Sequence, residues 1–139
     1  MSYDYSEKKI TAIISDKLPV GLALNALGHL AFSAGRYGSD GMMGQEVIID
    51  ANNTSHIGLS KYPFIVLKAD EEEIRSIIAK AKEKNIFTAD YSQEMFDTGP
   101  DEDLVNALSK AKDIRYHAAL LIGNSKEIKE LTGHLKLYR

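Results

Sequence analysis

The sequence contains no cysteine, and this absence excludes disulfide bonds, thiolate metal sites and cysteine nucleophiles. It also has no apolar run approaching the roughly 18 residues of a membrane-spanning helix, so we expect no membrane partner. Basic residues are not in excess, since 17 lysines and arginines stand against 20 aspartates and glutamates, for a net charge of −3. A chain with this balance has no general attraction for phosphate-rich partners.

The overall composition is that of one ordinary globular domain. The 139 residues are 44% hydrophobic and 27% charged. A chain of this length buries roughly 68–70% of its unfolded surface, which is enough for a core without metal or disulfide staples. The segment from Met1 to Lys9 is polar and unlike a signal peptide. We therefore expect a cytoplasmic protein with a single domain over residues 1–139.

Short β-branched runs alternate with longer segments of helical character along the chain. The apolar patterns predict strands at 10–15, 45–50, 63–69, 86–91, 116–122 and 134–138. Helix signals predict helices over 20–34 with an end at Gly35, after the cap Asp70, from Asp101, and from Asn124 or Ser125 through Leu131. This order indicates an α/β fold with a mixed sheet.

Three segments between these elements read as loops or turns. Four glycines make 35–44 a loop, and whether it closes over a site as a lid is left open. Residues 52–56 form a polar loop that contains His56. Asp97, Gly99 and Pro100 are ordinary turn formers and predict a turn.

The first predicted helix carries a polar stripe in an otherwise apolar sequence. Asn25, His29 and Ser33 recur at intervals of four residues, and Gly21 lies one turn before Asn25. Residues four apart share a helix face, and a buried polar group without a partner costs about 1–3 kcal/mol. The stripe must therefore bond to neighbouring loops, face solvent or line a cleft. The first of these is the commonest outcome for buried polar groups.

Two further positions follow predicted strands, where α/β proteins often bind ligands. The junction from Asp16 to Gly21 leads into a helix N-terminus, which favours anions, although neither nucleotide-binding glycine motif occurs there. Asp90 ends another strand, with turn formation as its alternative role. The candidate ligand-binding residues are Asp16, Gly21, Asn25, His29 and His56. The candidate catalytic residues are His29, Asn25 and Asp90.

The histidines give no metal motif. His29, His56, His117 and His134 include no pair at a spacing of three or four residues. We therefore expect no metal centre and no cofactor. His117 lies within an apolar run and is expected to be a packed or edge residue. The G-x-S-x-G elbow of serine hydrolases is also missing.

A longer pattern resembles a known superfamily. A strand, then DKLPVGLALNALGHLAFSAG, then FIVLKADEEEIRSIIAKAKEKNI, is similar in order to the type II peptidyl-tRNA hydrolases. The chain looks still more like an uncharacterised bacterial branch of that superfamily, the domain of unknown function numbered two thousand, with which it shares LIGNSKEIKELTGHLKLY near its end. The resemblance implies a three-layer α/β/α domain around a mixed, mostly parallel sheet. Together with the alternating terminal segment as a sheet edge, it implies a homodimer.

The hydrolase signature itself is not preserved. Gly21 matches the signature glycine, but Val20 and Leu22 occupy the positions of its two lysines, and Ala26 that of its glutamine. The second lysine is a proposed catalytic residue of the family, whereas leucine carries no charge and donates no hydrogen bond. The later aspartate-alanine-glycine-arginine-threonine motif is replaced by DYSQ, in which only Asp90 corresponds.

These departures favour a domain that has lost the family's chemistry and binds a small ligand or a protein partner. The alternative is a hydrolase of peptidyl-tRNA or a related ester or amide, with His29 as general base and Asn25 orienting the substrate or binding an oxyanion. Asp16 or Asp90 would then supply a supporting carboxylate. A third interpretation, binding of tRNA without catalysis, is disfavoured by the acidic balance.

Overall fold

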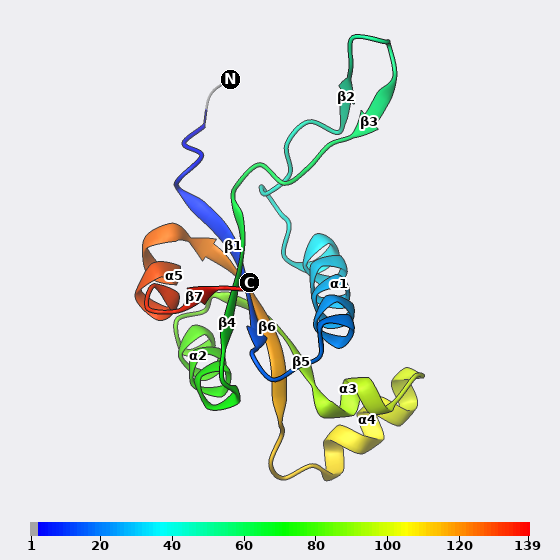
Figure 1. Cartoon of the computed structure of the whole chain (residues 1–139), viewed down its shortest axis with the longest axis vertical. Helices are drawn as coiled ribbons and strands as arrows, with labels where there is room; N and C mark the ends of the chain where they lie inside the picture. Colours follow the sequence, from blue (N-terminus) through cyan, green and yellow to red (C-terminus); the bar gives the residue numbers. More distant parts are fainter. Residues whose placement is uncertain (1–2) are drawn as a thin grey trace.

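The computed structural model describes residues 3–139 as a five-stranded sheet with helices and a separate hairpin (Figure 1). The sheet has the order β5-β6-β1-β4-β7. Its strands are β1 (Lys8–Ser15), β4 (Phe64–Ala69), β5 (Phe87–Ser92), β6 (Tyr116–Asn124) and β7 (Lys136–Leu137). The helices are α1 (Val20–Tyr37), α2 (Glu71–Glu83), α3 (Gln93–Asp97), α4 (Asp101–Lys110) and α5 (Ser125–Thr132). The predicted α/β class with a mixed sheet is confirmed.

The expectation that the sheet is mostly parallel is wrong. Only β1 and β4 pair in parallel, whereas the pairs β1–β6, β5–β6 and β4–β7 are antiparallel. Parallel neighbours need a long crossover connection, which α1 and the segment after it provide between β1 and β4. β6 instead lies between β1 and β5, which run in the same direction, so it is antiparallel to both.

Helices pack on both faces of this sheet (Figure 1). On one face α1 buries Ala26 and Leu30 against side chains of β1, β5 and β6. On the other face α2 and α5 bury residues such as Ile74 and Ile128. Because successive strand side chains point to opposite faces, β1 and β6 contribute to both clusters. Strands buried on both faces have nearly continuous apolar sequences, as the central parts of these two strands do.

The first helix is longer than its sequence predicts. It continues through Gly35 to Tyr37, and the N–H of Gly38 donates to the carbonyl of Ala34 at 2.9 Å. A glycine inside a helix costs about 1 kcal/mol relative to alanine. Packing of the alanine and leucine face of α1 against the sheet outweighs this cost, so the predicted end at Gly35 is wrong.

The predicted strand at 45–50 and the predicted polar loop at 52–56 form one hairpin, made of β2 (Val47–Ile49) and β3 (Ser55–Ile57). Asp50 Oδ1 accepts hydrogen bonds from the N–H groups of Asn52 and Thr54, at 2.8 and 3.0 Å. Asn53 takes a positive φ of 63° at the tip, a conformation that asparagine tolerates. The prediction of a loop over 52–56 is therefore wrong for Ser55 and His56, which belong to β3.

The predicted helix starts are confirmed. Asp70 Oδ1 accepts from the N–H of Glu73 at 2.8 Å, and Asn124 Oδ1 accepts from Lys126 N at 3.0 Å. The short α3 was not predicted, and it places Asp97, expected in a turn, at the end of a helix. β7 has only two residues and lies at the sheet edge, as its alternating sequence indicates.

None of the helices described here is long and apolar enough to cross a membrane.

Candidate functional site

Tyr91, near the end of β5, contacts two polar residues of α1, Asn25 and His29. Its Oη lies 3.5 Å from Asn25 Oδ1 and 3.4 Å from the carbonyl oxygen of Met95, so it can donate to either acceptor. Its ring centroid is 5.7 Å from that of His29. Tyr91 is 7% exposed, and this burial raises the pKa of its hydroxyl, which keeps it a neutral donor at neutral pH.

A cleft of about 520 Å³ opens beside Tyr91, and we call it the α1–β5 cleft. Its volume lies within the roughly 300–1,000 Å³ of small-molecule pockets. The polar residues that line it are His29, Ser33, Asp90, Tyr91, Thr98 and Asp101. Apolar side chains of Leu30, Met95 and Leu104 also line it. Within residues 3–139, no lysine or arginine lines this cleft, so it offers no fixed positive charge to a phosphate.

Asp90 lines the cleft, but its carboxylate pairs with a lysine on the opposite face of the sheet. Its Oδ2 is 3.8 Å from Lys82 Nζ of α2, as expected for a strand residue next to the α1-facing Tyr91. Burial raises the pKa of Asp90, and the positive charge of Lys82 partly offsets that increase. Asp90 and His29 therefore both line the cleft, but the carboxylate of Asp90 pairs with Lys82 of α2.

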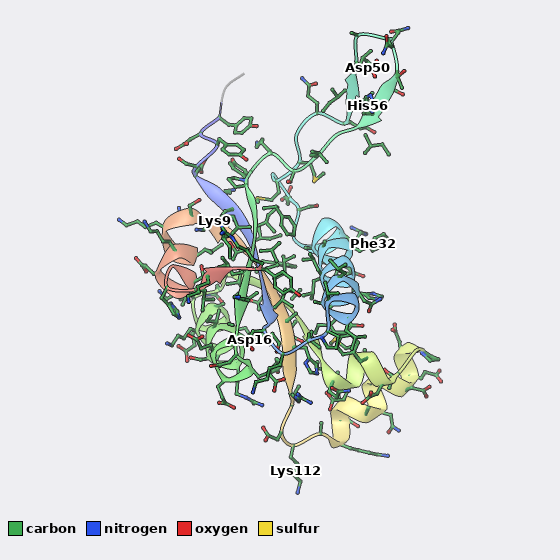
Figure 2. The ribbon with its side chains drawn as sticks, viewed as in Figure 1. Lys9, Asp16, Phe32, Asp50, His56 and Lys112 are labelled. Atoms are coloured by element: carbon green, nitrogen blue, oxygen red, sulfur yellow. The ribbon has the colours of Figure 1, made fainter. Side chains whose placement is uncertain are left out.

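Asp16 and Gly21 lie outside the α1–β5 cleft. The N–H of Asp16 donates to the carbonyl of Ala69 at 3.0 Å. Its side chain lines a separate hollow of about 320 Å³ with Asp70 and His134, close to α2 (Figure 2). Gly21 is exposed in the first turn of α1, with nothing within 4 Å of the position of a Cβ.

His56 is far from the other candidates. Its Nε2 is 2.9 Å from Asp50 Oδ2, and both residues lie on the hairpin that projects from the body of the molecule (Figure 2). The hydrogen bond with His56 is the largest of the interactions that lower the pKa of Asp50. Of the five candidate ligand-binding residues, the structure thus brings together Asn25 and His29, around Tyr91.

His117 is buried among polar partners, which confirms the expectation of a packed histidine. Its Nε2 is 2.7 Å from Gln93 Oε1, and the amide nitrogen of Gln93 donates to Asp97 Oδ1 at 3.0 Å. This second bond orients the amide, so His117 donates through Nε2–H and leaves Nδ1 unprotonated when neutral. Nδ1 faces Glu71 Oε1 at 3.7 Å.

Charges around His117 act on it in both directions. Desolvation and the Arg115 guanidinium lower its pKa, while Glu71 opposes this decrease. Arg115 Nε donates to both carboxylate oxygens of Glu71, at 3.0 and 2.9 Å, and these bonds lower the pKa of Glu71. Because Glu71 belongs to α2, Gln93 to α3 and His117 to β6, this network joins three elements. We therefore assign it a structural role.

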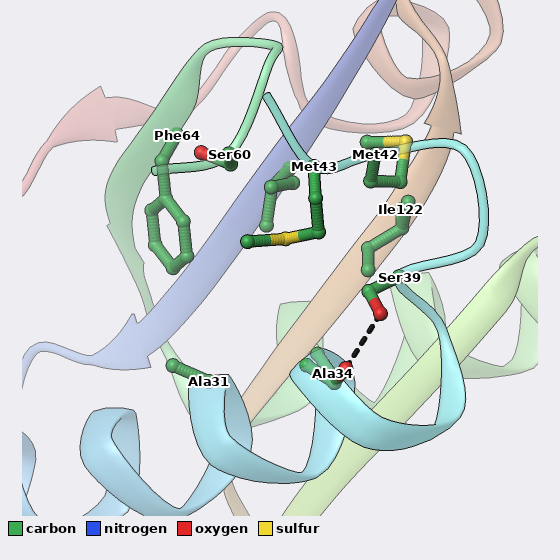
Figure 3. A pocket seen from close by; sticks show the side chains of 10 residues that line it. Ala31, Ala34, Ser39, Met42, Met43, Ser60, Phe64 and Ile122 are labelled. Atoms are coloured by element: carbon green, nitrogen blue, oxygen red, sulfur yellow. Dashed lines mark hydrogen bonds between the residues drawn. The ribbon is translucent and has the colours of Figure 1, made fainter. Parts of the chain in front are cut away.

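A smaller apolar pocket of about 170 Å³ lies between α1 and the base of the hairpin (Figure 3). Met42, Met43, Phe64 and Ile122 line it together with small residues of α1. This pocket could not be predicted from the sequence, because its residues come from four separate segments. In the part of the chain that the structure describes, no three histidine, aspartate or glutamate side chains gather to hold a metal ion.

The comparisons with known proteins identify the family. Residues 8–139 match the family described as "Protein of unknown function (DUF2000)". The chain belongs to this family. A similar protein of solved structure is Atu0240, a protein of unknown function from Agrobacterium tumefaciens strain C58. It is 26% identical, with a TM-score of 0.82, and the match covers 96% of this chain and 98% of that one. The search of curated proteins finds no match.

Proposed function

We propose that this DUF2000 protein binds a small polar molecule in the α1–β5 cleft. One observation carries the proposal: His29 and Ser33 of the polar stripe of α1 meet the buried Tyr91 at a cleft of about 520 Å³. Clefts with an apolar lining and a few convergent polar groups are typical ligand sites. Leu30, Met95 and Leu104 would contact the apolar part of the ligand, and His29 and Ser33 would form hydrogen bonds with it.

The charge of the cleft defines the chemical class of the ligand. Asp101 supplies a carboxylate, and Thr98 and Ser33 supply hydroxyl groups. A carboxylate accepts hydrogen bonds from ammonium and hydroxyl groups and repels phosphate. The proposed ligand is therefore a small amine- or hydroxyl-bearing molecule without a phosphate group, which also disfavours tRNA as the partner.

The finer description of the scaffold is also a proposal. Helices on both faces of the sheet support a three-layer α/β/α arrangement of the type II peptidyl-tRNA hydrolase kind. Leu22, at the position of the family's second lysine, is exposed and does not line the α1–β5 cleft. The first observation supports the scaffold. The second supports the loss of the chemistry of the peptidyl-tRNA hydrolases.

The hydrolase alternative rests on the position of Asn25 and His29 next to Tyr91. A general-base histidine is usually oriented by a third group, often a carboxylate. The carboxylate of Asp90 pairs with Lys82, and Asp16 lines a different hollow. The binding proposal needs no such carboxylate, and we therefore prefer it.

Thermal unfolding of the purified protein with small amines, polyols and their phosphorylated counterparts tests the proposal. A ligand at 100 times its Kd stabilises the folded state by about 2.7 kcal/mol. We expect unphosphorylated compounds to raise Tm in the wild type and in the control His134→Ala, an exposed histidine outside the cleft. The increase should be lost in His29→Ala. Equal shifts in all three proteins, or none with any compound, would refute the proposal.

A further inference from the structure

The hairpin of β2 and β3 has an apolar face that nothing in its own chain covers. Val47 pairs with Ile57, and Ile49 lies two residues from Val47 on the same strand, so these three side chains share one face. All three are exposed, and Ile57 is 89% exposed. Figure 1 shows the hairpin projecting clear of the sheet and of α1.

The opposite face of the hairpin is more polar. It carries Ile48 opposite His56, and His56 is bound to Asp50. One face of the hairpin is therefore more apolar than the other, and an exposed apolar patch marks an interaction site. An isolated two-stranded hairpin is also marginally stable in water. The exposed apolar face and the marginal stability of a lone hairpin both indicate that this segment packs against another surface.

The outer side of α1 is a second uncovered apolar surface. Leu24 and Phe32 are exposed there, and Phe32 is 85% exposed and points away from the body (Figure 2). Gly21, Gly28 and Gly35 recur every seven residues on this side, with nothing within 4 Å of their Cβ positions. Their lack of side chains lets another backbone approach α1 closely.

The apolar pocket of Figure 3 connects the two surfaces. It lies beside Gly35 and Ala31 of α1 and beside Met43 at the base of the hairpin. Its volume is about 170 Å³, and a cavity of about 150 Å³ in another protein accommodates benzene. It can therefore receive one large apolar side chain from a neighbouring molecule.

We propose that a second copy of this chain covers these surfaces, with the hairpin of each copy packed on the outer side of α1 of the other. A two-fold dimer requires a surface that contacts itself or a reciprocal pair of surfaces, and one chain carries both members of such a pair. Eleven residues of α1 are exposed, and with the eleven residues of the hairpin from Val47 to Ile57 they reach the roughly 20–30 residues per partner of a standard interface.

This dimer also bears on the α1–β5 cleft, although the inference does not depend on ligand binding. His29 belongs both to that cleft and to a shallow hollow on the outer side of α1 formed with Leu24 and Phe32. A hairpin seated on this hollow would cover the open side of His29. The dimer surface proposed here differs from the terminal sheet edge that the sequence suggests, since β7 lies at the far edge from β5.

The test is the molar mass of the full chain in solution, measured by light scattering over a concentration series. The wild type should have twice the 15.4 kDa of one chain. Phe32→Asp and Ile57→Asp should each be monomeric, because either change places a charge in the apolar contact. Val105→Asp, at a 66% exposed position of α4, and Leu137→Asp, at the edge strand β7, should remain dimeric.

A monomeric wild type at every concentration overturns the proposal. So does a dimer that Leu137→Asp disrupts and Phe32→Asp leaves intact, because the edge strand would then be the interface. A second measurement needs no substitution: amide hydrogen exchange of 47–49 and 55–57 in the wild type should slow as protein concentration increases. Exchange that is independent of concentration across the dissociation range would contradict an interface at the hairpin.

Discussion

The ring of His29 on α1 lies 5.7 Å from the ring of Tyr91 on β5, with an angle of 35° between the two planes. Tyr91 also contacts the ring of Phe96, with centroids 4.7 Å apart, so it joins α1, β5 and α3. One buried side chain thus supports both the polar stripe of α1 and one wall of the α1–β5 cleft.

The ring and the hydroxyl group of Tyr91 should contribute separately to stability. Tyr91→Phe removes the donor near Asn25 and Met95, and we expect a loss of about 0.5–1.5 kcal/mol in the free energy of unfolding. Tyr91→Ala also removes the packed ring and should cost about 3–5 kcal/mol. Urea denaturation measures both. A Tyr91→Phe variant as stable as the wild type would contradict a hydrogen-bonding role for the hydroxyl, and equal losses for the two variants would contradict a packing role for the ring.

His117 should make the protein less stable in mild acid. Its pKa in the folded state lies below the ordinary 6.5, mainly through desolvation. As pH falls through 6.5 towards the folded pKa, the unfolded chain takes up the proton first, so the free energy of unfolding decreases. Above that range His117 is neutral in both states and contributes no such loss.

Denaturation curves between neutral pH and pH 5 test this prediction. His117→Gln keeps a neutral polar side chain next to Gln93 and should remove part of the decrease below pH 6.5. The matched control His134→Gln changes an exposed histidine that pairs with Glu73 and should retain that part. A decrease that is the same in His117→Gln and the wild type would exclude His117 as its source.

Asp90 should have a raised pKa, and the positive charge of Lys82 should make this increase smaller. Burial disfavours the Asp90 carboxylate, and the ammonium of Lys82, 3.8 Å away, favours it. Because the folded pKa is above 3.8, this group contributes most to stability at low pH, and that contribution is lost as pH rises from 3.8 through the folded pKa. Lys82→Ala should raise the pKa of Asp90 further, as measured by carbon-detected NMR titration. An unchanged pKa would show that the pair is not formed in solution.

The wild type should not hydrolyse peptidyl-tRNA. Leu22 replaces the family's second lysine, and no lysine or arginine among residues 3–139 lines the α1–β5 cleft. A purified peptidyl-tRNA can be incubated with the wild type, with Leu22→Lys and with a known active enzyme as the positive control. Turnover by the wild type would show that the lysine is dispensable and would favour the hydrolase alternative with His29 and Asn25.

Sequence spacing predicted the part of the candidate site that belongs to α1. Asn25, His29 and Ser33 stand four residues apart, and a helix places such residues on one side whatever its surroundings. What could not be predicted is their contact with Tyr91, the last residue of the strand predicted at 86–91. Tyr91 reaches α1 only because β6 lies between β1 and β5 and sets the position of β5 in the sheet, and the order of strands is a property of the whole fold.

The errors arise where tertiary contacts override local preference. Gly35 is a good helix terminator in isolation, but α1 continues past it because neighbouring residues such as Ala34 pack on the sheet. The grouping of His56 with the residues of α1 rested on residue type alone. The hairpin carries His56 away from the body, and its position depends on how the chain leaves α1 after Gly38.

The most direct test of the central claim is an NMR titration of the ¹⁵N-labelled wild type with the small amines and polyols that raise its Tm. We predict chemical-shift changes centred on the lining of the α1–β5 cleft, at His29, Ser33, Tyr91, Thr98 and Asp101. His29→Ala should weaken the binding while its spectrum remains that of a folded protein. Shift changes confined to another surface, or their absence with every compound of this class, would contradict a ligand site between α1 and β5.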